Sequence, residues 1–124
     1  MPKTEIERIS IARDYFPYPG GRFRRNGAGS GEEFRDDVLA PALHRALSAG
    51  QFVVIDLDGV MGYPGSFLEE AFGGLIRVNG FGKTELERCL RIEATEPHLQ
   101  IYKEIALEYI DDAATLNARR RAVA

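Results

Sequence analysis

Two aspartates at the end of an apolar stretch are the first candidates for chemistry in this sequence. The stretch runs from Phe52 to Leu57. Asp56 and Asp58 lie at its end, separated by Leu57. Paired carboxylates at the end of a strand can supply a nucleophile and a proton donor for phosphoryl transfer. That chemistry also needs positive groups that neutralise the phosphoryl charge. The alternative interpretation is that Asp58 and the glycine after it form a turn.

The Asp-Leu-Asp-Gly segment resembles the first motif of haloacid-dehalogenase-type phosphatases. In that family the first aspartate, here Asp56, would be the nucleophile, and the second, here Asp58, would handle the proton of the leaving group. Asp111 and Asp112 imitate the metal-binding acidic pair of that family, but they fall within an amphipathic helical pattern rather than at a strand end. We therefore expect no catalytic residue, no metal site and no cofactor, and a small phosphatase is the less favoured alternative.

A glycine-rich loop at 26–31, with Gly29 and Ser30 at its centre, is the second candidate. Backbone amides in such a loop, next to a helix start, favour the binding of phosphate or carboxylate groups. Arg22 and Arg25 lie just upstream and would add bidentate phosphate contacts. No Gly-Lys-Ser/Thr follows, so the loop is not a P-loop. It predicts either a phosphate- or nucleotide-binding site or a turn before a capped helix.

Ser66 is the third candidate, at the start of a helical pattern. Ser66 and Glu69 form a Ser-x-x-Glu capping box, and Glu69 and Glu70 complement the positive end of the helix dipole. A nucleophilic serine needs a general base, and no motif links the two histidines, His44 and His98, to Ser66. Ser66 is therefore either a helix cap alone or a cap that is also a regulatory or binding position, since a helix start tolerates a phosphate.

A strand, a loop and a helix must position these candidates. The strand at 52–58 has no clean alternation, which is typical of a strand covered on both faces. The loop at 58–66 is rich in glycine and proline. The helix from Ser66 to about Val78 has apolar residues at helical spacing. The preceding helix should begin near Gly31 and end at Gly50, with Pro41 kinking it or splitting it in two.

The remaining segments complete an alternation of strands and helices. A half-exposed strand is predicted at 5–12, and a short second strand at 22–25 pairs back on it. The loop 79–83 exposes Phe81, and Thr84 and Glu87 form a further capping box. A strand at 90–94 precedes a last helix with Pro97 in its first turn. The predicted buried stripe of this helix consists of Leu99, Tyr102, Ala106, Tyr109, Ile110 and Ala113. The pattern predicts one α/β domain over residues 1–124, with a small mixed sheet and helices packed on it.

Composition limits the classes of partner. The chain of 124 residues has a formal net charge of −3, so neither nucleic acid nor a membrane surface is expected as partner. One cysteine excludes an internal disulfide. No stretch approaches the ~20 apolar residues of a membrane span, and the first residues lack a signal-like apolar core. A cytoplasmic protein is the expectation.

The segment from Ser66 to Gly73, Ser-Phe-Leu-Glu-Glu-Ala-Phe-Gly, resembles a known pattern. It matches the Ser-Phe-x-(Asp/Glu)-Glu-x-Phe-Gly hallmark of bacterial STAS-like domains of unknown function. The upstream half resembles that family at Gly21-Arg22, Gly27, Ser30-Gly31, Phe34-Arg35, Leu39 and Pro41. The resemblance covers nearly the whole chain and implies a single STAS-like domain.

More distantly, the chain is similar to STAS domains of the anti-sigma-factor antagonists. There a strand is followed by Asp-Ser-Ser-Gly, and the serine at the helix start is phosphorylated by a partner kinase. Ser66 stands at that serine, whereas Pro64 and Gly65 stand where the aspartate and the first serine would be. The resemblance implies a non-enzymatic regulatory module that binds a protein, such as a histidine-kinase-like ATPase or a transcription regulator. We expect the binding edge to consist of Arg22, Arg25, Gly29, Ser30, Asp58, Tyr63, Gly65, Ser66, Glu69 and Glu70.

Overall fold

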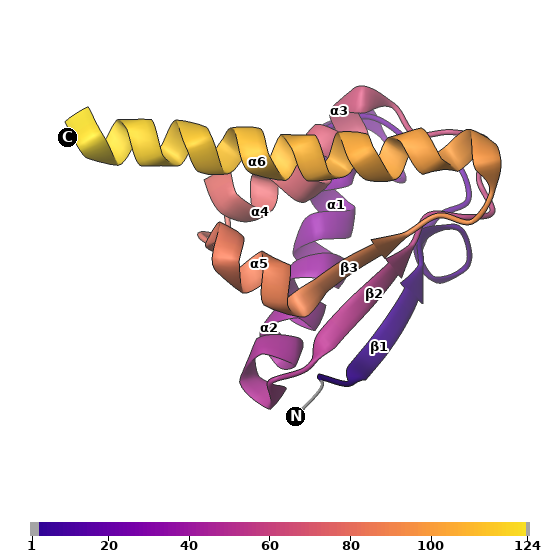
Figure 1. The fold of residues 1–124 in the computed structure, drawn as a ribbon. Coiled ribbons are helices and arrows are strands. Elements are labelled where there is room, and N and C mark those ends of the chain that lie inside the picture. The colour runs from indigo at the N-terminus through magenta and orange to yellow at the C-terminus, as the bar shows by residue number, and fades with distance from the viewer. Residues whose placement is uncertain (1–2, 124) are drawn as a thin grey trace.

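Three parallel strands form one open sheet in the computed structural model, which describes residues 3–123 (Figure 1). They are β1 (Glu5–Ser10), β2 (Phe52–Asp56) and β3 (Leu90–Glu93), with β2 in the middle. Ile55 pairs with Ile9 on one side and with Ile92 on the other. The α/β class is confirmed, and within the described part of the chain the sheet is parallel throughout rather than mixed.

β1 ends at Ser10, two residues before its predicted end, and a π-helical turn (Ile11–Tyr15) follows it. The connection from β1 to β2 then ends in one continuous helical run with a widened turn. It comprises α1 (Gly31–Phe34), a π-helical turn (Arg35–Leu39) and α2 (Ala40–Ala49). In a regular helix the ring of Pro41 would meet the carbonyl four residues earlier. Here the Ala40 amide donates to the Arg35 carbonyl, five residues back, which makes room for Pro41. Pro41 therefore widens the predicted helix instead of splitting it.

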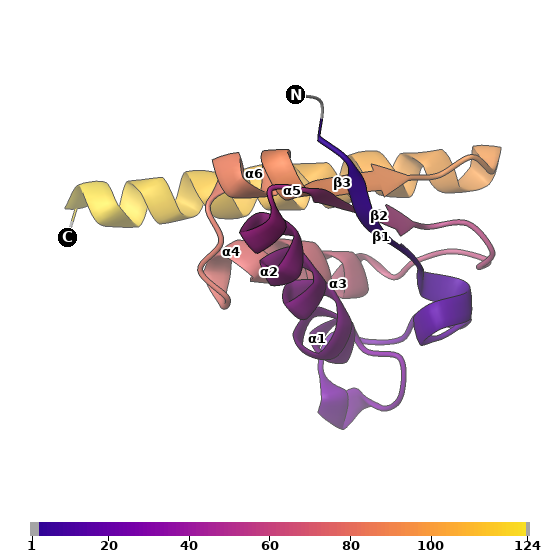
Figure 2. The same ribbon diagram turned by 90° about the horizontal axis from the view of Figure 1, so that it is seen from below.

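The connection from β2 to β3 contains a second run of the same kind. It comprises α3 (Gly65–Leu68), a π-helical turn (Glu69–Gly73) and α4 (Gly74–Arg77), followed by α5 (Lys83–Cys89). Figure 2 shows α1 to α4 on one face of the sheet. The helix starts one residue before its predicted position, with Pro64 at the N-cap, so the capping box proposed for Ser66 and Glu69 is wrong.

The last helix is the longest element of the fold. A 3₁₀ turn (Pro97–Leu99) leads into α6 (Gln100–Val123), with Pro97 in the first turn as predicted. Its buried side chains are Ala106, Ile110 and Ala113, which belong to the predicted apolar stripe. They pack α6 across α3 and α4, and the C-terminal part of α6 runs on beyond the rest of the fold (Figure 1).

Three smaller predictions were wrong. Residues 24–26 form a 3₁₀ turn and not a strand, because the Phe23 carbonyl accepts from the Asn26 amide. The fifth helix begins at Lys83, and its box partner is Glu85, which accepts from the Gly82 amide at 2.9 Å. Phe81 is buried rather than exposed, because it stacks on His44 with ring centroids 4.7 Å apart.

The two faces of the sheet differ in how they are covered. Val53 and Ile55 point into the helix-covered core. Val54, on the other face, is only 1% exposed, because its lateral neighbours Arg8 and Arg91 lie on either side of it. Long charged side chains can cover apolar surface with their stems in this way. No helix within residues 3–123 is both long enough and apolar enough to cross a membrane.

Candidate functional site

A buried network of arginines and glutamates lies where the two helical runs cross. Arg35 and Glu70 form its centre and are only 2% and 4% exposed. An Arg35 guanidinium nitrogen donates both to the Glu70 carboxylate and, at 2.9 Å, to the Glu70 backbone carbonyl. A buried charge is stable only when it is paired and hydrogen-bonded. The network therefore fixes how the two runs cross.

Glu69 and Glu70 join this centre to two further arginines. Arg22 donates to Glu69 and, at 3.3 Å, to Glu70. Arg77 donates to Glu69 at 2.5 and 3.1 Å and to Glu70 at 3.4 Å. Desolvation, the largest single influence, raises the pKa of Glu69, but the pairs with Arg77 and Arg22 outweigh it, so the pKa lies below its usual value. Glu69 is thus held as a carboxylate by both arginines.

Glycines allow the two runs to approach closely at this network. A Cβ on Gly31 would lie 2.6 Å from the Phe67 carbonyl oxygen, and one on Gly74 would lie 2.3 Å from an Arg35 nitrogen. Phe34 and Phe67 stack beside this contact, with ring centroids 6.0 Å apart. The starts of α1 and α3 therefore lie side by side.

The glycine-rich loop is closed by its own hydrogen bonds. The Gly31 and Glu32 amides donate to the Gly21 and Arg22 carbonyls, each at 3.0 Å. Ser30 is buried and caps α1 as predicted, its hydroxyl accepting from the Glu33 amide at 3.1 Å. The amides at 31–33 are thus already engaged.

The arginines upstream of this loop are engaged as well. Arg24 pairs with Asp37 at 2.6 Å, and Arg25 lies over the Phe23 ring at 4.7 Å. Arg22 is taken by Glu69 and Glu70. With Arg22 and the amides at 31–33 so engaged, the predicted anion site around Gly29 and Ser30 loses most of its donors.

The β2–α3 loop is anchored at its base by Asp58. Its carboxylate accepts from the Thr95 amide at 2.9 Å, from the Thr95 hydroxyl at 2.5 Å and from the Glu96 amide at 3.1 Å. Desolvation, the largest influence, raises the pKa of Asp58, but these hydrogen bonds outweigh it and leave the pKa below its usual value. Asp58 therefore joins this loop to the connection between β3 and α6.

Tyr63 anchors the other end of the same loop. Its hydroxyl donates to the Leu57 carbonyl at 2.7 Å, and its ring lies between those of Phe67 and Tyr102. Burial raises the pKa of Tyr63, and the nearby carboxylates Asp56 and Asp58 add to the rise. The tyrosine therefore remains a neutral hydrogen-bond donor in the wall of the loop.

Ser66 lies beyond this anchor, in the first turn of α3. It is half-buried, and Gly65 before it is exposed. Because Pro64 holds the N-cap position, the Ser66 hydroxyl is not the cap of the helix. Ser66 precedes Glu69 and Glu70 by one turn and so lies on the same helix face as the ion-pair network.

A sequence profile of the family described as STAS-like domain of unknown function matches residues 30–100, more than half of the chain. The chain belongs to this family. No curated protein and no solved structure matches it. The matched span of the STAS-like domain contains Ser66, Asp58 and four members of the ion-pair network, whereas β1, Arg22 and nearly all of α6 lie outside it.

The C-terminal ends of the strands of the STAS-like domain border a solvent-open hollow of about 280 Å³. Asp56 and Asp58 lie in its wall together with Ser10, Ala12, Arg13, Gly59 and Glu96. Asp56 accepts from the Asp58 amide at 2.9 Å, and Asp58 is occupied by Thr95 and Glu96. Both aspartates thus have a structural task at the end of β2, and Asp111, far along α6, pairs with Lys83 instead.

Sequence reasoning missed Arg35 and Arg77 as members of the site. A signal for Arg35 was present, because Arg35 precedes Leu39 by four residues and so falls on the apolar stripe of its helix. Glu70 falls on the apolar side of its helix in the same way, three residues after Phe67. Two opposite charges on two buried stripes predict a buried pair.

Proposed function

We propose that this STAS-like domain is a non-enzymatic regulatory module that binds a protein partner through the β2–α3 loop and the start of α3. The observation that supports the proposal is the contrast within this loop. Its two ends are anchored by Asp58 and Tyr63, while Met61 between them is 91% exposed. An apolar side chain on a rigid, exposed loop is suited to protein recognition, since little ordering is needed on binding.

Ser66 is the regulatory position in this proposal. Its hydroxyl is not used as a cap, and the start of a helix tolerates negative charge. A phosphoryl group on Ser66 would lie one turn from Glu69 and Glu70 and would compete with them for Arg22. Modification would thus alter both the charge of the loop and the contacts that hold the 20–30 segment against it.

The partner class follows from the family resemblance and from the surface. A histidine-kinase-like ATPase or a transcription regulator, acting in the cytoplasm, is the partner we propose. The loop surface has exposed apolar and backbone groups at Met61, Pro64 and Gly65, which suits a protein surface better than a nucleic acid.

The test is an affinity pull-down from lysate of the native host with wild type, Ser66→Asp and Met61→Glu. We expect a partner on wild type that is lost with Met61→Glu and with Ser66→Asp, while thermal melts stay unchanged. Thr115→Asp is the matched control, because it adds the same charge at an exposed position of α6. Equal recovery of every partner on all four proteins would overturn the assignment of the loop as the binding surface.

A further inference from the structure

Residues 16–28, which we call the strap, lead from the π-helical turn after β1 toward the start of α1. All residues of the strap belong to the described part of the chain, and none of them is buried. Its regular structure is the 3₁₀ turn Arg24–Asn26. Figure 2 shows the strap on the side of the helices that faces away from the sheet. Because a segment with few buried side chains belongs to the least stable part of a fold, opening the strap costs less than unfolding the core.

Two backbone carbonyls close the strap against α1. The carbonyls of Gly21 and Arg22 accept from the amides of Gly31 and Glu32, each at 3.0 Å. Neutral hydrogen bonds of this kind contribute little net free energy, because water replaces the lost partner when they open. The Gly31 and Glu32 amides therefore report whether the strap is closed.

The Arg22 side chain adds a stronger contact, which reaches the second helical run. Its guanidinium donates to Glu69 and, at 3.3 Å, to Glu70. The side chains of Arg22 and Glu69 are partly shielded, being 33% and 23% exposed. The other ion pair of the strap, between Arg24 and Asp37, is open to water, with side chains 46% and 53% exposed. Since shielded charge-assisted pairs contribute more than exposed ones, Arg22 rather than Arg24 holds the strap.

We propose that the strap opens locally, without unfolding of the core, and that the Arg22–Glu69 ion pair is the latch that keeps it closed. Opening withdraws Arg22 from Glu69 and frees the Gly31 and Glu32 amides. It thereby uncovers a carboxylate one turn after Ser66, on the same helix face. The closed strap covers this carboxylate and is thus an autoinhibitory contact beside the β2–α3 loop.

This opening goes beyond the proposed function and does not depend on it, because it is a property of the chain without a partner. A ligand that binds only to the open state would shift the equilibrium toward that state. Recovery of a partner through the β2–α3 loop and opening of the strap are measured separately, so either can fail while the other holds.

Amide hydrogen exchange of the full chain, followed by NMR at several low concentrations of urea, tests the proposal. In wild type the Gly31 and Glu32 amides should exchange faster than the amides of β2 and depend less on urea, because local opening exposes little surface. Arg22→Gln should speed the exchange of these two amides by at least about tenfold relative to β2. Glu69→Gln should act in the same direction, because it removes the other half of the ion pair.

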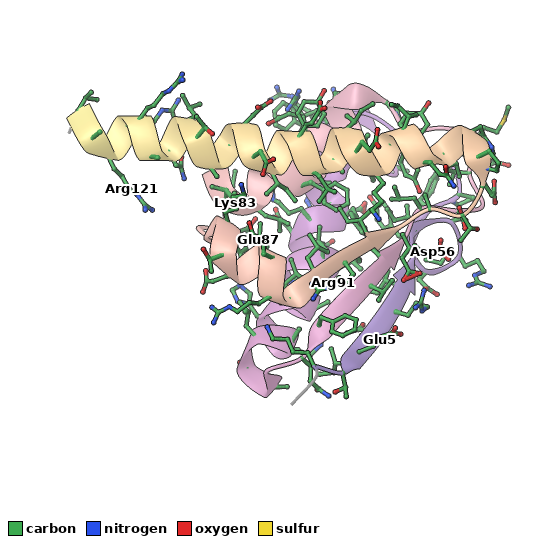
Figure 3. All side chains as sticks on the ribbon, in the orientation of Figure 1. Glu5, Asp56, Lys83, Glu87, Arg91 and Arg121 are labelled. Carbon is green, nitrogen blue, oxygen red and sulfur yellow. The ribbon has the colours of Figure 1, made fainter. Side chains whose placement is uncertain are left out.

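Arg24→Gln is the matched control, since it makes the same substitution within the strap at the exposed pair. It should speed the exchange of the same amides by no more than about threefold. Arg121→Gln controls for the loss of one positive charge and should exchange as wild type does, because Arg121 lies at the far end of α6 (Figure 3). Gly31 and Glu32 amides that exchange only together with β2 would overturn the proposal, as would equal exchange in Arg22→Gln and Arg24→Gln.

Discussion

The starts of α1 and α3 lie side by side and share the pattern Ser-x-x-Glu, yet they are built in different ways. Ser30 is fully buried, caps its helix and is surrounded by hydrogen-bonded loop amides. Ser66 is half-buried, lies inside its helix and leaves the N-cap to Pro64. The glutamates of the two patterns, Glu33 and Glu69, also differ. Glu69 forms ion pairs with Arg22 and Arg77. The serine at the start of α1 therefore has a structural role, whereas the serine at the start of α3 is partly accessible to solvent.

The cause of the difference lies outside the motif. A capping box satisfies backbone amides only when its glutamate is available to reach back to them. Arg22 and Arg77 lie close enough to Glu69 to form charge-assisted pairs, which are stronger than a neutral hydrogen bond. The same Ser-x-x-Glu pattern can therefore cap a helix or supply a glutamate for ion pairs. Neighbouring residues from other parts of the fold determine which of the two occurs.

The largest expected effect comes from breaking the buried pair beneath the α3 start. Arg35→Ala and Glu70→Ala should each lower the free energy of unfolding by about 3–5 kcal/mol, because either leaves a buried charge without its nearest partner. Urea denaturation measures the change. Glu108→Ala, on the exposed side of α6, is the control and should stay within about 0.5 kcal/mol.

The double variant Arg35→Met/Glu70→Leu sharpens this test. Apolar replacement of a whole buried pair is often neutral or stabilising, so the double variant should be more stable than either single alanine variant. A double variant as unstable as the sum of the singles would show that the pair is not the source of the effect.

The first helical residues, Gly31 and Gly65, offer the next comparison. Gly31→Ala should cost about 1–3 kcal/mol, because its Cβ would overlap the Phe67 carbonyl. At Gly65 an added Cβ would meet only the Tyr109 hydroxyl, at 3.5 Å. Gly65→Ala should therefore be neutral or gain up to about 1 kcal/mol. Equal losses in thermal melts would mean that the two helix starts are packed alike.

Replacing the two serines, Ser30 and Ser66, should change the free energy of unfolding by smaller amounts than the variants above. Ser30→Ala should lose about 0.5–2 kcal/mol, because it removes the acceptor of the Glu33 amide. Ser66→Ala should change the free energy of unfolding by no more than about 0.5 kcal/mol, because its hydroxyl is not a cap. A loss of 1 kcal/mol or more at Ser66 in chemical denaturation would restore the capping role that its sequence suggests.

The smallest effect is a dependence on pH at the α3 side. Asp58 and Glu69 have lowered pKa values in the folded chain, so the stability they contribute is complete above their ordinary pKa. It is lost as the pH falls through the lowered values. Urea melts should show stability falling below about pH 4, with a smaller fall in Asp58→Asn and Glu69→Gln. Asp112→Asn should follow wild type, and identical slopes in all four proteins would contradict this origin.

The sequence was sufficient for what depends on local pattern. The three strands β1, β2 and β3 with the helices between and after them, the buried stripe of α6 and the cap at Ser30 follow from periodicity and turn chemistry, and the structure agrees. Local pattern failed where long-range neighbours decide, at the helix start near Ser66 and at Phe81, which His44 covers. The arginine network joins residues up to 48 positions apart, a pairing that no local window contains.

The parallel sheet has a consequence for how the chain reaches this structure. β1 pairs with β2 at Glu5–Phe52, and β2 pairs with β3 at Val53–Leu90, so each pairing waits for a long intervening segment. Closing such loops costs entropy before the contacts repay it, and folding rates fall as contacts become less local. The helical runs that meet at Arg35 and Glu70 bring these distant strands together, so variants of the network should slow folding as well as weaken the folded state.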